Sequence, residues 1–372
     1  MKIIVSANSS WNLYNFRKKI LKVIEDQFNC YFIFLCPEDK YIEKLNLKKS
    51  SFRKVSINPR KFNIFQDIYL FFQYFYYFLK ERPDLYISFT IKPNLYGATL
   101  ANLFSIKSIN NFTGLGNLFN SGKIKKIIII IVLKIILYKS KYIFFHNNDN
   151  LQLFVKNKIA HNSKFILVPG SGVDLKKFSL NNNPIHKEKI NFLFFSRIMK
   201  EKGIIEFLTV AKKIKNQHEN INFSILGKID TNEKFIIDLL NQCIKTKIVK
   251  YYGFKDNVIN IVKKYDCIVL PTYHEGMSKS LLESAALSKP IISTDIPGVR
   301  EIVVNKQDGF LVKPFDIPDL LNKINDFIKL SYNKKTQMAK KSRNIIEKNF
   351  DEKIVINKYI SVFKEILLQN KD

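Results

Sequence analysis

Short apolar segments alternate with helical segments along most of the chain, and this alternation limits the possible folds more than any other feature. Apolar runs of this length, separated by helical segments, predict a parallel α/β sheet with helices on both faces. In the first half we expect strands at 2–6, 31–35, 85–89, 108–111 and 142–145, and helices at 15–26, 66–80 and 96–104.

The same pattern restarts after residue 168, so the chain contains two α/β halves. Its 372 residues are enough for about two domains, each with a core of its own. Open α/β sheets bind ligands at the carboxyl ends of their strands, so we expect a ligand cleft between the halves. The expected strands of the second half lie at 192–195, 222–226, 249–252, 267–270, 290–293 and 309–312, and the expected helices at 203–215, 256–264, 279–287, 319–330 and 352–368.

Composition excludes a disordered chain, because 46% of the residues are hydrophobic. The 61 Lys and Arg against 32 Asp and Glu give a net charge of +29. This excess either reflects coding bias or attracts the protein to an anionic surface. Lysines dominate and are spread along the chain, whereas proteins that read DNA cluster arginines at base edges. We therefore predict an anionic membrane surface as a partner and no nucleic acid.

The most apolar segment, 127–138, is too short for a spanning helix, which needs about 20 apolar residues. Lysines flank it on both sides, and two interpretations remain open, a buried core helix and an interfacial helix in the headgroup layer. The aromatic run 69–78 is predicted to be core. No signal-peptide pattern is visible, and Cys30, Cys36, Cys243 and Cys267 form no C-x-x-C pair, so we expect reduced thiols and a cytoplasmic location at the inner membrane face.

The segment 271–283, PTYHEGMSKSLLE, combines a strand end, a loop and a helix start. Free N–H groups and the helix dipole at such a start suit a phosphate. Glu275 lies in the loop, and Glu283 lies on a helix that is otherwise mostly apolar. A carboxylate in that position needs a partner. The partner is either a sugar or ribose diol, or a local group that Glu283 caps or pairs with.

A second candidate segment, 194–203, places Arg197 just past a strand end and Lys202 before the next helix. Arginine is rare in this chain, and its planar fork matches phosphate oxygens, while lysine adds a point charge. These two residues are therefore predicted to bind phosphate.

These segments resemble the retaining glycosyltransferases of the large GT-B family that includes sucrose synthases and bacterial mannosyltransferases. The resemblance runs through residues 165–320. The amino-terminal half is similar to a bacterial subgroup that extends undecaprenyl-diphosphate-linked sugars for capsule, O-antigen or protein-glycan assembly. The residues that carry both likenesses are Glu275-x7-Glu283, Arg197 with Lys202-Gly203, Tyr252-Gly253-Phe254 with Val258, 297–301 (PGVRE), 10–17 (SWNLYNFR), 89–97 (FTIKPNLYG) and 111–116 (NFTGLG).

The resemblance implies two Rossmann-like domains whose parallel sheets face a central cleft. They are an acceptor-side domain over 1–167, to which a closing helix at about 352–372 returns, and a nucleotide-sugar-binding domain over 168–351. In the family, residues at the positions of Arg197 and Lys202 neutralise the nucleotide diphosphate. The position of Glu275 contacts the donor sugar and that of Glu283 holds the ribose. The remaining donor contacts implied are Gly253 and Phe254 at the base, and Gly276, Met277, Ser278 and Lys279 around the sugar and distal phosphate.

On the acceptor side the resemblance implies Asn12, Lys92, Asn94, Thr113 and Gly114. The amino-terminal half departs from the pattern of the family at two places. The first strand–helix loop, 7–10, lacks the glycine pair of many relatives, and the stretch 110–114 lacks their histidine. His146 lies further along the chain.

No D-x-D motif occurs, and no pattern suggests a metal site, so basic side chains and a helix terminus are expected to stabilise the leaving diphosphate. We therefore predict a metal-independent, retaining hexosyltransferase without a cofactor. It would move a hexosyl or N-acetylhexosaminyl group from a UDP-sugar to a lipid-linked saccharide. Two alternatives are a UDP-sugar epimerase of the same architecture and a basic protein that binds membrane or RNA.

Overall fold

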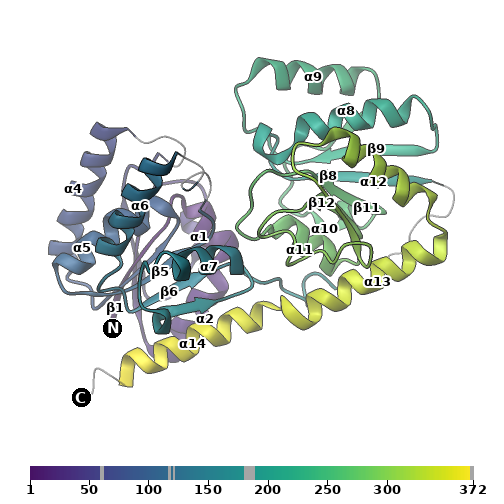
Figure 1. Ribbon diagram of the computed structural model, residues 1–372. Helices are drawn as coiled ribbons and strands as arrows, with labels where there is room; N and C mark the ends of the chain where they lie inside the picture. The colour runs from purple at the N-terminus through teal and green to yellow at the C-terminus, as the bar shows by residue number, and fades with distance from the viewer. Residues whose placement is uncertain (59–62, 116–118, 120–121, 180–188, 369–372) are drawn as a thin grey trace. The chain divides into compact units, whose positions relative to one another are not determined.

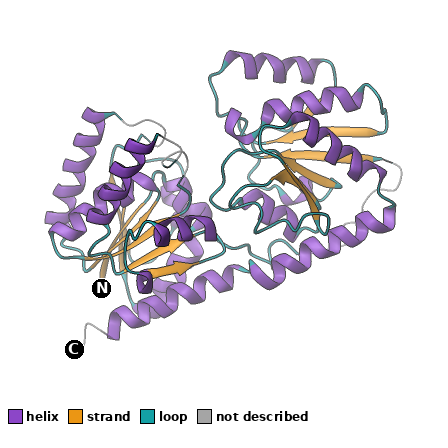
Figure 2. Cartoon of the chain, viewed as in Figure 1, coloured by secondary structure: helices purple, strands orange, loops and turns teal. Residues whose placement is uncertain are grey.

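The computed structural model describes residues 1–58, 63–115, 119, 122–179 and 189–368. The chain divides into two compact units, the first formed by Met1–Ser171 with Lys353–Asp372 and the second by Gly172–Glu352. In each unit a parallel sheet is flanked by helices (Figures 1 and 2).

The first unit contains a seven-stranded sheet in the order β3-β2-β1-β4-β5-β6-β7, and neighbouring strands in it are parallel. This order is that of a doubly wound sheet, because the chain moves outward from β1 in both directions. The strands are β1 (Lys2–Ser6), β2 (Tyr31–Cys36), β3 (Ser50–Lys54), β4 (Leu85–Phe89), β5 (Lys107–Phe112), β6 (Tyr142–Phe145) and β7 (Phe165–Leu167).

Helices cover both faces of this sheet, because successive side chains of a strand point to opposite faces. Ile3 and Val5 of β1 belong to the core under α1, α2 and α14, whereas Ile4 belongs to the core under α4 and α5. The helices of this unit are α1 (Ser10–Phe16), α2 (Lys18–Phe28), α3 (Ile42–Leu45), α4 (Ile64–Glu81), η1 (Pro93–Gly97), α5 (Ala98–Leu103), α6 (Lys123–Ile136), α7 (Asn148–Lys156), η2 (Asn162–Lys164) and α14 (Glu352–Leu368).

The second unit contains a six-stranded parallel sheet in the order β10-β9-β8-β11-β12-β13. Aromatic side chains fill its core, and the rings of Phe194 and Phe207 lie 5.3 Å apart. The strands are β8 (Ile190–Phe195), β9 (Ile221–Leu226), β10 (Val249–Tyr251), β11 (Cys267–Leu270), β12 (Ile291–Thr294) and β13 (Gly309–Val312). The helices are η3 (Lys200–Lys202), α8 (Ile204–Lys215), α9 (Lys234–Lys245), α10 (Ile259–Val262), α11 (Lys279–Ala286), α12 (Ile317–Lys329) and α13 (Tyr332–Asn349).

Two parallel sheets with flanking helices confirm the predicted α/β fold class. The last helix, α14, packs against the first unit: Tyr359 stacks on Phe144 with ring centroids 4.5 Å apart. Its described residues end at Leu368, so the last four residues of the expected closing helix lie outside the described part.

The prediction of an aromatic core at 69–78 is wrong for one face of α4. Tyr74 and Phe78 are buried, but Tyr69, Phe72 and Tyr76 are each more than half exposed. Both the buried and the exposed face of α4 carry mainly apolar residues, so the sequence pattern does not indicate which face is exposed.

Helix α6 is buried along one side only. Leu133 and Ile136 are buried, whereas Ile127, Ile131 and Ile135 are more than half exposed. A fully buried core helix is therefore excluded within the first unit. Helices α4 and α6 lie on the same side of this sheet (Figure 1), and both leave apolar side chains uncovered there.

Candidate functional site

Most of the predicted donor-side residues lie just beyond the carboxyl ends of the strands of the second sheet. Arg197 follows β8, Gly253 and Phe254 follow β10, and Glu275 follows β11. Parallel strands share one carboxyl edge, so segments far apart in sequence meet there.

Lys202 and Glu275 form an ion pair at this edge. Lys202 Nζ donates to Glu275 Oε1 at 2.7 Å, and the two side chains are only 13% and 11% exposed. The turn at Gly203 makes this approach possible. Gly203 has φ +72°, and a Cβ there would collide with the Pro271 carbonyl oxygen at the end of β11. The structure therefore joins a predicted phosphate-binding lysine to the predicted sugar-contacting glutamate.

Arg197 pairs with Asp230, which the sequence analysis did not single out. Arg197 Nη1 donates to Asp230 Oδ2 at 2.7 Å, and the Arg197 side chain is 53% exposed. A parallel bridge between Ile198 and Ile229 aligns the segments that follow β8 and β9. The position of Asp230 shortly after a strand end was the available signal. The exposed guanidinium keeps donors that face solvent.

Glu283 lies on α11 and is partly buried. Among the described residues its carboxylate makes no hydrogen bond or ion pair, so the local-capping interpretation has no support there. Burial raises the pKa of Glu283, and the nearby Lys279 and Lys177 act in the opposite direction. An acceptor of this kind can take two hydroxyl donors from a diol.

The loop that carries Gly276, Met277 and Ser278 rests on the segment around Gly298. Ser278 N donates to Gly298 O at 3.4 Å. Gly298 has φ +80°, and a Cβ there would lie 2.5 Å from Gly276 O. Lys279, the first residue of α11, donates through Nζ to Gly172 O at 2.6 Å. The loop is thus held at the start of a helix, where N–H groups are exposed to a ligand.

Gly253 and Phe254, predicted to line the base, follow the short edge strand β10. Gly253 has φ +68°, and its carbonyl accepts from Gly227 N at 3.0 Å. Phe254 is 46% exposed, which leaves an aromatic face open for stacking.

A polar contact missed from the sequence supports the Glu275 loop from behind. Tyr273 donates to Glu206 Oε1 at 2.5 Å, and its ring lies 4.2 Å from that of Phe315. Tyr273 N also donates to Glu201 O at 2.9 Å. Nothing in the spacing of these residues indicates their meeting.

In the first unit two of the predicted acceptor-side residues have structural partners. Lys92 Nζ donates to Asp67 Oδ1 at 2.6 Å, and both side chains are nearly buried. Asn94 accepts from Ser88 Oγ at 2.5 Å and donates to Asn111 O at 2.8 Å. Their acceptor roles remain predictions.

The other three acceptor-side residues are partly exposed. Asn12 has a buried Oδ1 without a hydrogen-bond partner in the described part of the chain. Thr113 and Gly114 follow β5 at the carboxyl edge of the first sheet.

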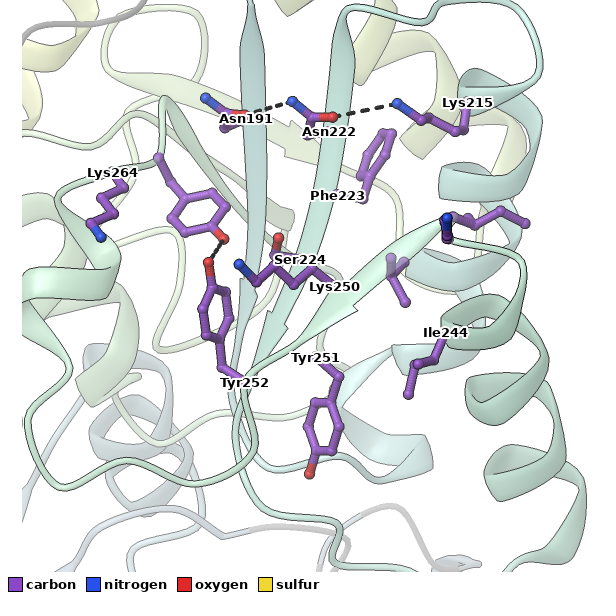
Figure 3. A pocket seen from close by; sticks show the side chains of 14 residues that line it. Asn191, Lys215, Asn222, Phe223, Ser224, Ile244, Lys250, Tyr251, Tyr252 and Lys264 are labelled. Atoms are coloured by element: carbon purple, nitrogen blue, oxygen red, sulfur yellow. Dashed lines mark hydrogen bonds between the residues drawn. The ribbon is translucent and has the colours of Figure 1, made fainter.

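A cavity of about 650 Å³ in the second unit contains none of the predicted site residues (Figure 3). Asn191 and Asn222, which lie near the starts of β8 and β9, line it and are joined by a hydrogen bond of 3.0 Å. Tyr252 and Tyr265 also line it, and the Tyr265 hydroxyl donates to the Tyr252 hydroxyl at 3.0 Å. Its lining extends from the starts of β8 and β9 to the end of β10 and does not include Arg197 or Glu275.

No described helix has both the length and the apolarity to cross a bilayer. No group of three or more His, Cys, Asp or Glu side chains in the described ranges could hold a metal ion.

Comparison with known proteins places the chain among glycosyltransferases. Residues 176–345 match the family model "Glycosyl transferases group 1". The N,N'-diacetylbacillosaminyl-diphospho-undecaprenol alpha-1,3-N-acetylgalactosaminyltransferase of Campylobacter jejuni is 26% identical, over 99% of each chain. The UDP-Gal:alpha-D-GlcNAc-diphosphoundecaprenol alpha-1,3-galactosyltransferase of Escherichia coli is 28% identical, over 73% of each chain. The capsular polysaccharide biosynthesis glycosyltransferase CapM of Staphylococcus aureus is 24% identical, over 84% of each.

Solved structures agree on the fold. Anabaena Alr3699/HepE in complex with UDP and glucose superimposes with a TM-score of 0.78 at 15% identity, over 98% of this chain and 99% of that one. A glycosyltransferase from Rickettsia africae gives a TM-score of 0.77 at 18% identity, over 98% of each chain.

The two Rossmann-like units have the GT-B fold of these solved structures. Residues 176–345 match the group 1 glycosyltransferases, and the two relatives compared over most of the chain are sugar transferases. This confirms the predicted family and enzyme class, and the epimerase and non-enzyme alternatives are not retained.

Proposed function

We propose that the enzyme transfers a hexosyl or N-acetylhexosaminyl group from a UDP-sugar to a saccharide linked to undecaprenyl diphosphate. The contact between Lys202 and Glu275 carries this proposal, because it places a phosphate-binding cation beside a carboxylate that can face the transferred sugar. The names of two relatives, matched over 99% and 73% of this chain, describe transfer to undecaprenyl-diphosphate-linked sugars, which supports the acceptor class.

In the proposed mechanism the second unit holds the donor. Arg197 and Lys202 bind the diphosphate, whose negative charge grows as the glycosidic bond breaks. Glu275 contacts the sugar, Glu283 accepts the ribose hydroxyls, and Phe254 stacks on the base. The loop formed by Gly276, Met277 and Ser278, together with the first turn of α11 at Lys279, surrounds the distal phosphate.

Two further features of the reaction belong to the same proposal. The configuration at the anomeric carbon is retained, in keeping with the alpha linkages in the names of the relatives. The leaving diphosphate is stabilised by Arg197, Lys202 and helix N–H groups without a divalent metal ion.

We also propose that the first unit rests on the anionic inner leaflet through the α4–α6 face. This face consists of Phe65, Ile68, Tyr69, Phe72 and Tyr76 of α4 and Ile124, Ile127, Ile128, Ile131 and Ile135 of α6, all more than half exposed. Lysines 123, 125, 126 and 134 accompany the apolar side chains on α6, and basic residues near a leaflet add about 1 kcal/mol each. A peripheral position of this kind gives access to a lipid-linked acceptor.

Co-sedimentation with liposomes tests this placement. We expect wild-type protein to bind anionic vesicles and to dissociate as salt rises, because exposed charges are screened beyond about 8–10 Å at 0.1–0.15 M. The double variant Ile127→Glu/Ile131→Glu should lose binding, while Phe235→Glu, at an apolar residue 65% exposed on α9, should not. Equal binding to neutral vesicles, or loss with Phe235→Glu, would contradict the placement.

A donor panel tests the catalytic proposal. The purified protein is incubated with radiolabelled UDP-, GDP- and ADP-sugars and a lipid extract that contains undecaprenyl-linked saccharides. We expect label to enter the organic-soluble fraction from a UDP-sugar, and transfer from a GDP- or ADP-sugar alone would refute the donor assignment.

A further inference from the structure

Arg17 is a buried cation in the first unit, and the predicted donor site does not use it. It lies between α1 and α2 and is 2% exposed. Its guanidinium carbon is 4.4 Å from the ring centroid of Phe89, the last residue of β4. Its Nη2 lies 3.4 Å from Nε2 of His146, which directly follows β6. The side chain therefore reaches across the carboxyl edge of the first sheet.

No counter-charge accompanies this guanidinium in the described part of the chain. Nε and Nη1 of Arg17 have no hydrogen-bond partner there. Burial lowers the pKa of Arg17, and burial together with the neighbouring Arg17 lowers the pKa of His146. A neutral His146 accepts from Arg17 and carries no negative charge. An unpaired buried cation is costly, and arginine side chains in such places have an anionic partner.

Arg53 in the same unit shows the contrasting case. Arg53 Nε donates to Glu81 Oε1 at 2.8 Å, and Nη2 lies 2.8 Å from the same oxygen. This arginine has its carboxylate within the fold, whereas Arg17 has an aromatic ring and a neutral imidazole.

Other unsatisfied polar atoms lie in the segments that follow β1 and β4 at the same sheet edge. Ser10 Oγ and Asn12 Oδ1 belong to the segment after β1, and Thr90 Oγ1 directly follows β4. β1 and β4 are neighbours in the sheet. Thr90 also has φ +78°, a conformation that costs energy in a residue with a branched side chain. Unpartnered groups and backbone strain therefore coincide where Arg17 is held.

We propose that Arg17 binds a phosphate group of a substrate diphosphate, with Phe89 and His146 as positioning residues. Nε and Nη1 of the planar guanidinium keep N–H donors without a partner in the described part of the chain, and these can donate to phosphate oxygens. The inference rests on the proposed function for the identity of the substrate. The diphosphate belongs either to the lipid-linked acceptor or to the nucleotide donor.

Hydrogen exchange with inorganic diphosphate tests the site without any sugar transfer. The full-length protein is compared with Arg17→Met, which keeps the length and removes the charge, and with Arg53→Met as the matched control. We expect diphosphate to slow exchange at residues 7–17, 90–92 and 146–150 in the wild type and in Arg53→Met, and not in Arg17→Met. No protection of these segments in the wild type would overturn the proposal, even if the donor site in the second unit is protected.

Steady-state kinetics then show whether Arg17 binds the diphosphate of the lipid-linked acceptor or that of the nucleotide donor. Loss of charge-assisted hydrogen bonds is expected to raise one KM by about 10–100-fold. A rise in acceptor KM alone assigns the acceptor diphosphate, and a rise in donor KM with weaker UDP binding assigns the donor diphosphate. Wild-type values for both in Arg17→Met would refute the site.

Two further variants keep the test decisive if Arg17→Met folds poorly. Arg17→Lys keeps the charge without the fork, so we expect diphosphate protection and the affected KM to fall between wild type and total loss. His146→Gln keeps an acceptor for Arg17 and should retain most of the protection. Full wild-type behaviour of Arg17→Lys, or equal loss in Arg53→Met, would contradict a specific role of the Arg17 fork.

Discussion

Lys202 Nζ and Glu275 Oε1 lie 2.7 Å apart, although the two residues are 73 positions apart in the sequence. The pair is largely buried, so each charge compensates the other before any donor binds. A bound diphosphate offers Lys202 a second anionic partner, and Glu275 is then free to respond to charge on the sugar. The pair is thus the structural link between donor binding and bond cleavage in the proposed mechanism.

The first prediction concerns Arg197, whose exposed guanidinium already pairs with Asp230. Arg197→Ala should lower kcat/KM by about 10–150-fold, because charge-assisted hydrogen bonds to the diphosphate are lost. Arg197→Lys should recover only part of the activity, since the fork is missing. Lys323→Ala removes a surface ion pair with Asp326 and serves as the control. Wild-type turnover in Arg197→Ala would refute the assignment.

The second prediction separates the two glutamates by steady-state donor kinetics. Glu275→Gln should chiefly lower kcat, because its contact strengthens as charge develops on the sugar. Glu283→Gln should chiefly raise donor KM, because the ribose does not react. Free UDP should bind more weakly to Glu283→Gln and almost normally to Glu275→Gln. Thermal melting controls for folding, and an equal loss of UDP affinity in both variants would show that the roles are not divided.

The third prediction is a pH dependence of UDP binding. Burial raises the pKa of Glu283, so its carboxylate becomes protonated at a higher pH than an exposed glutamate. Protonation removes an acceptor for the ribose, and UDP affinity should therefore fall as the pH drops through this raised pKa. UDP binding to the wild type and to Glu283→Gln is measured by calorimetry over a range of pH. Protonation of UDP itself affects both proteins equally, so it cancels in the comparison. Glu283→Gln should lack the additional loss of UDP affinity at low pH. Parallel pH profiles for the two proteins would show that Glu283 does not cause this loss.

The fourth prediction concerns metal ions. Transfer should persist after extensive treatment with EDTA, because Arg197, Lys202 and helix N–H groups are proposed to stabilise the leaving diphosphate. Activity is measured before and after chelation, and then with Mg²⁺ or Mn²⁺ restored. Loss on chelation with recovery by either ion would show that the proposed stabilisation is incomplete.

The fifth prediction concerns stability and Asp308. This side chain is fully buried, its Oδ2 lacks a partner in the described part of the chain, and burial raises its pKa to about 6 from 3.8. The folded state thus binds this proton more tightly than the unfolded state. The free energy of unfolding should fall as pH rises from about 4 to about 6, by roughly 3 kcal/mol from this group. Denaturant unfolding of Asp308→Asn should lack this decrease, and an identical slope in the variant would contradict the assignment.

The regular part of the fold could be predicted from sequence because its strands are short apolar runs bounded by polar loops. Strands 2–6, 85–89, 142–145, 267–270 and 309–312 have the bounds expected. Helix α13 was missed because it is rich in lysine and buries few large apolar side chains. The expected helix at 256–264 is shorter, since only Ile259–Val262 is helical.

The site was predictable residue by residue, but its contacts were not. Arg197, Lys202 and Glu275 each follow a strand or precede a helix, which is a local signal. The pairing of Arg197 with Asp230 depends on β8 and β9 being neighbours in the sheet, and the isolation of Arg17 depends on what surrounds it. Such relationships arise from strand order and burial, which no local pattern encodes.

The most direct test of the proposed function is mass spectrometry of the glycolipid product. The purified enzyme is incubated with a UDP-sugar and a synthetic polyprenyl-diphosphate-linked saccharide, with Glu275→Gln in parallel. We predict that the acceptor gains the mass of one sugar residue in an alpha linkage, and that the gain is strongly reduced in the variant. An acceptor whose mass is unchanged with every UDP-sugar, while a GDP- or ADP-sugar or a lipid-free acceptor supports transfer, would contradict the proposed reaction.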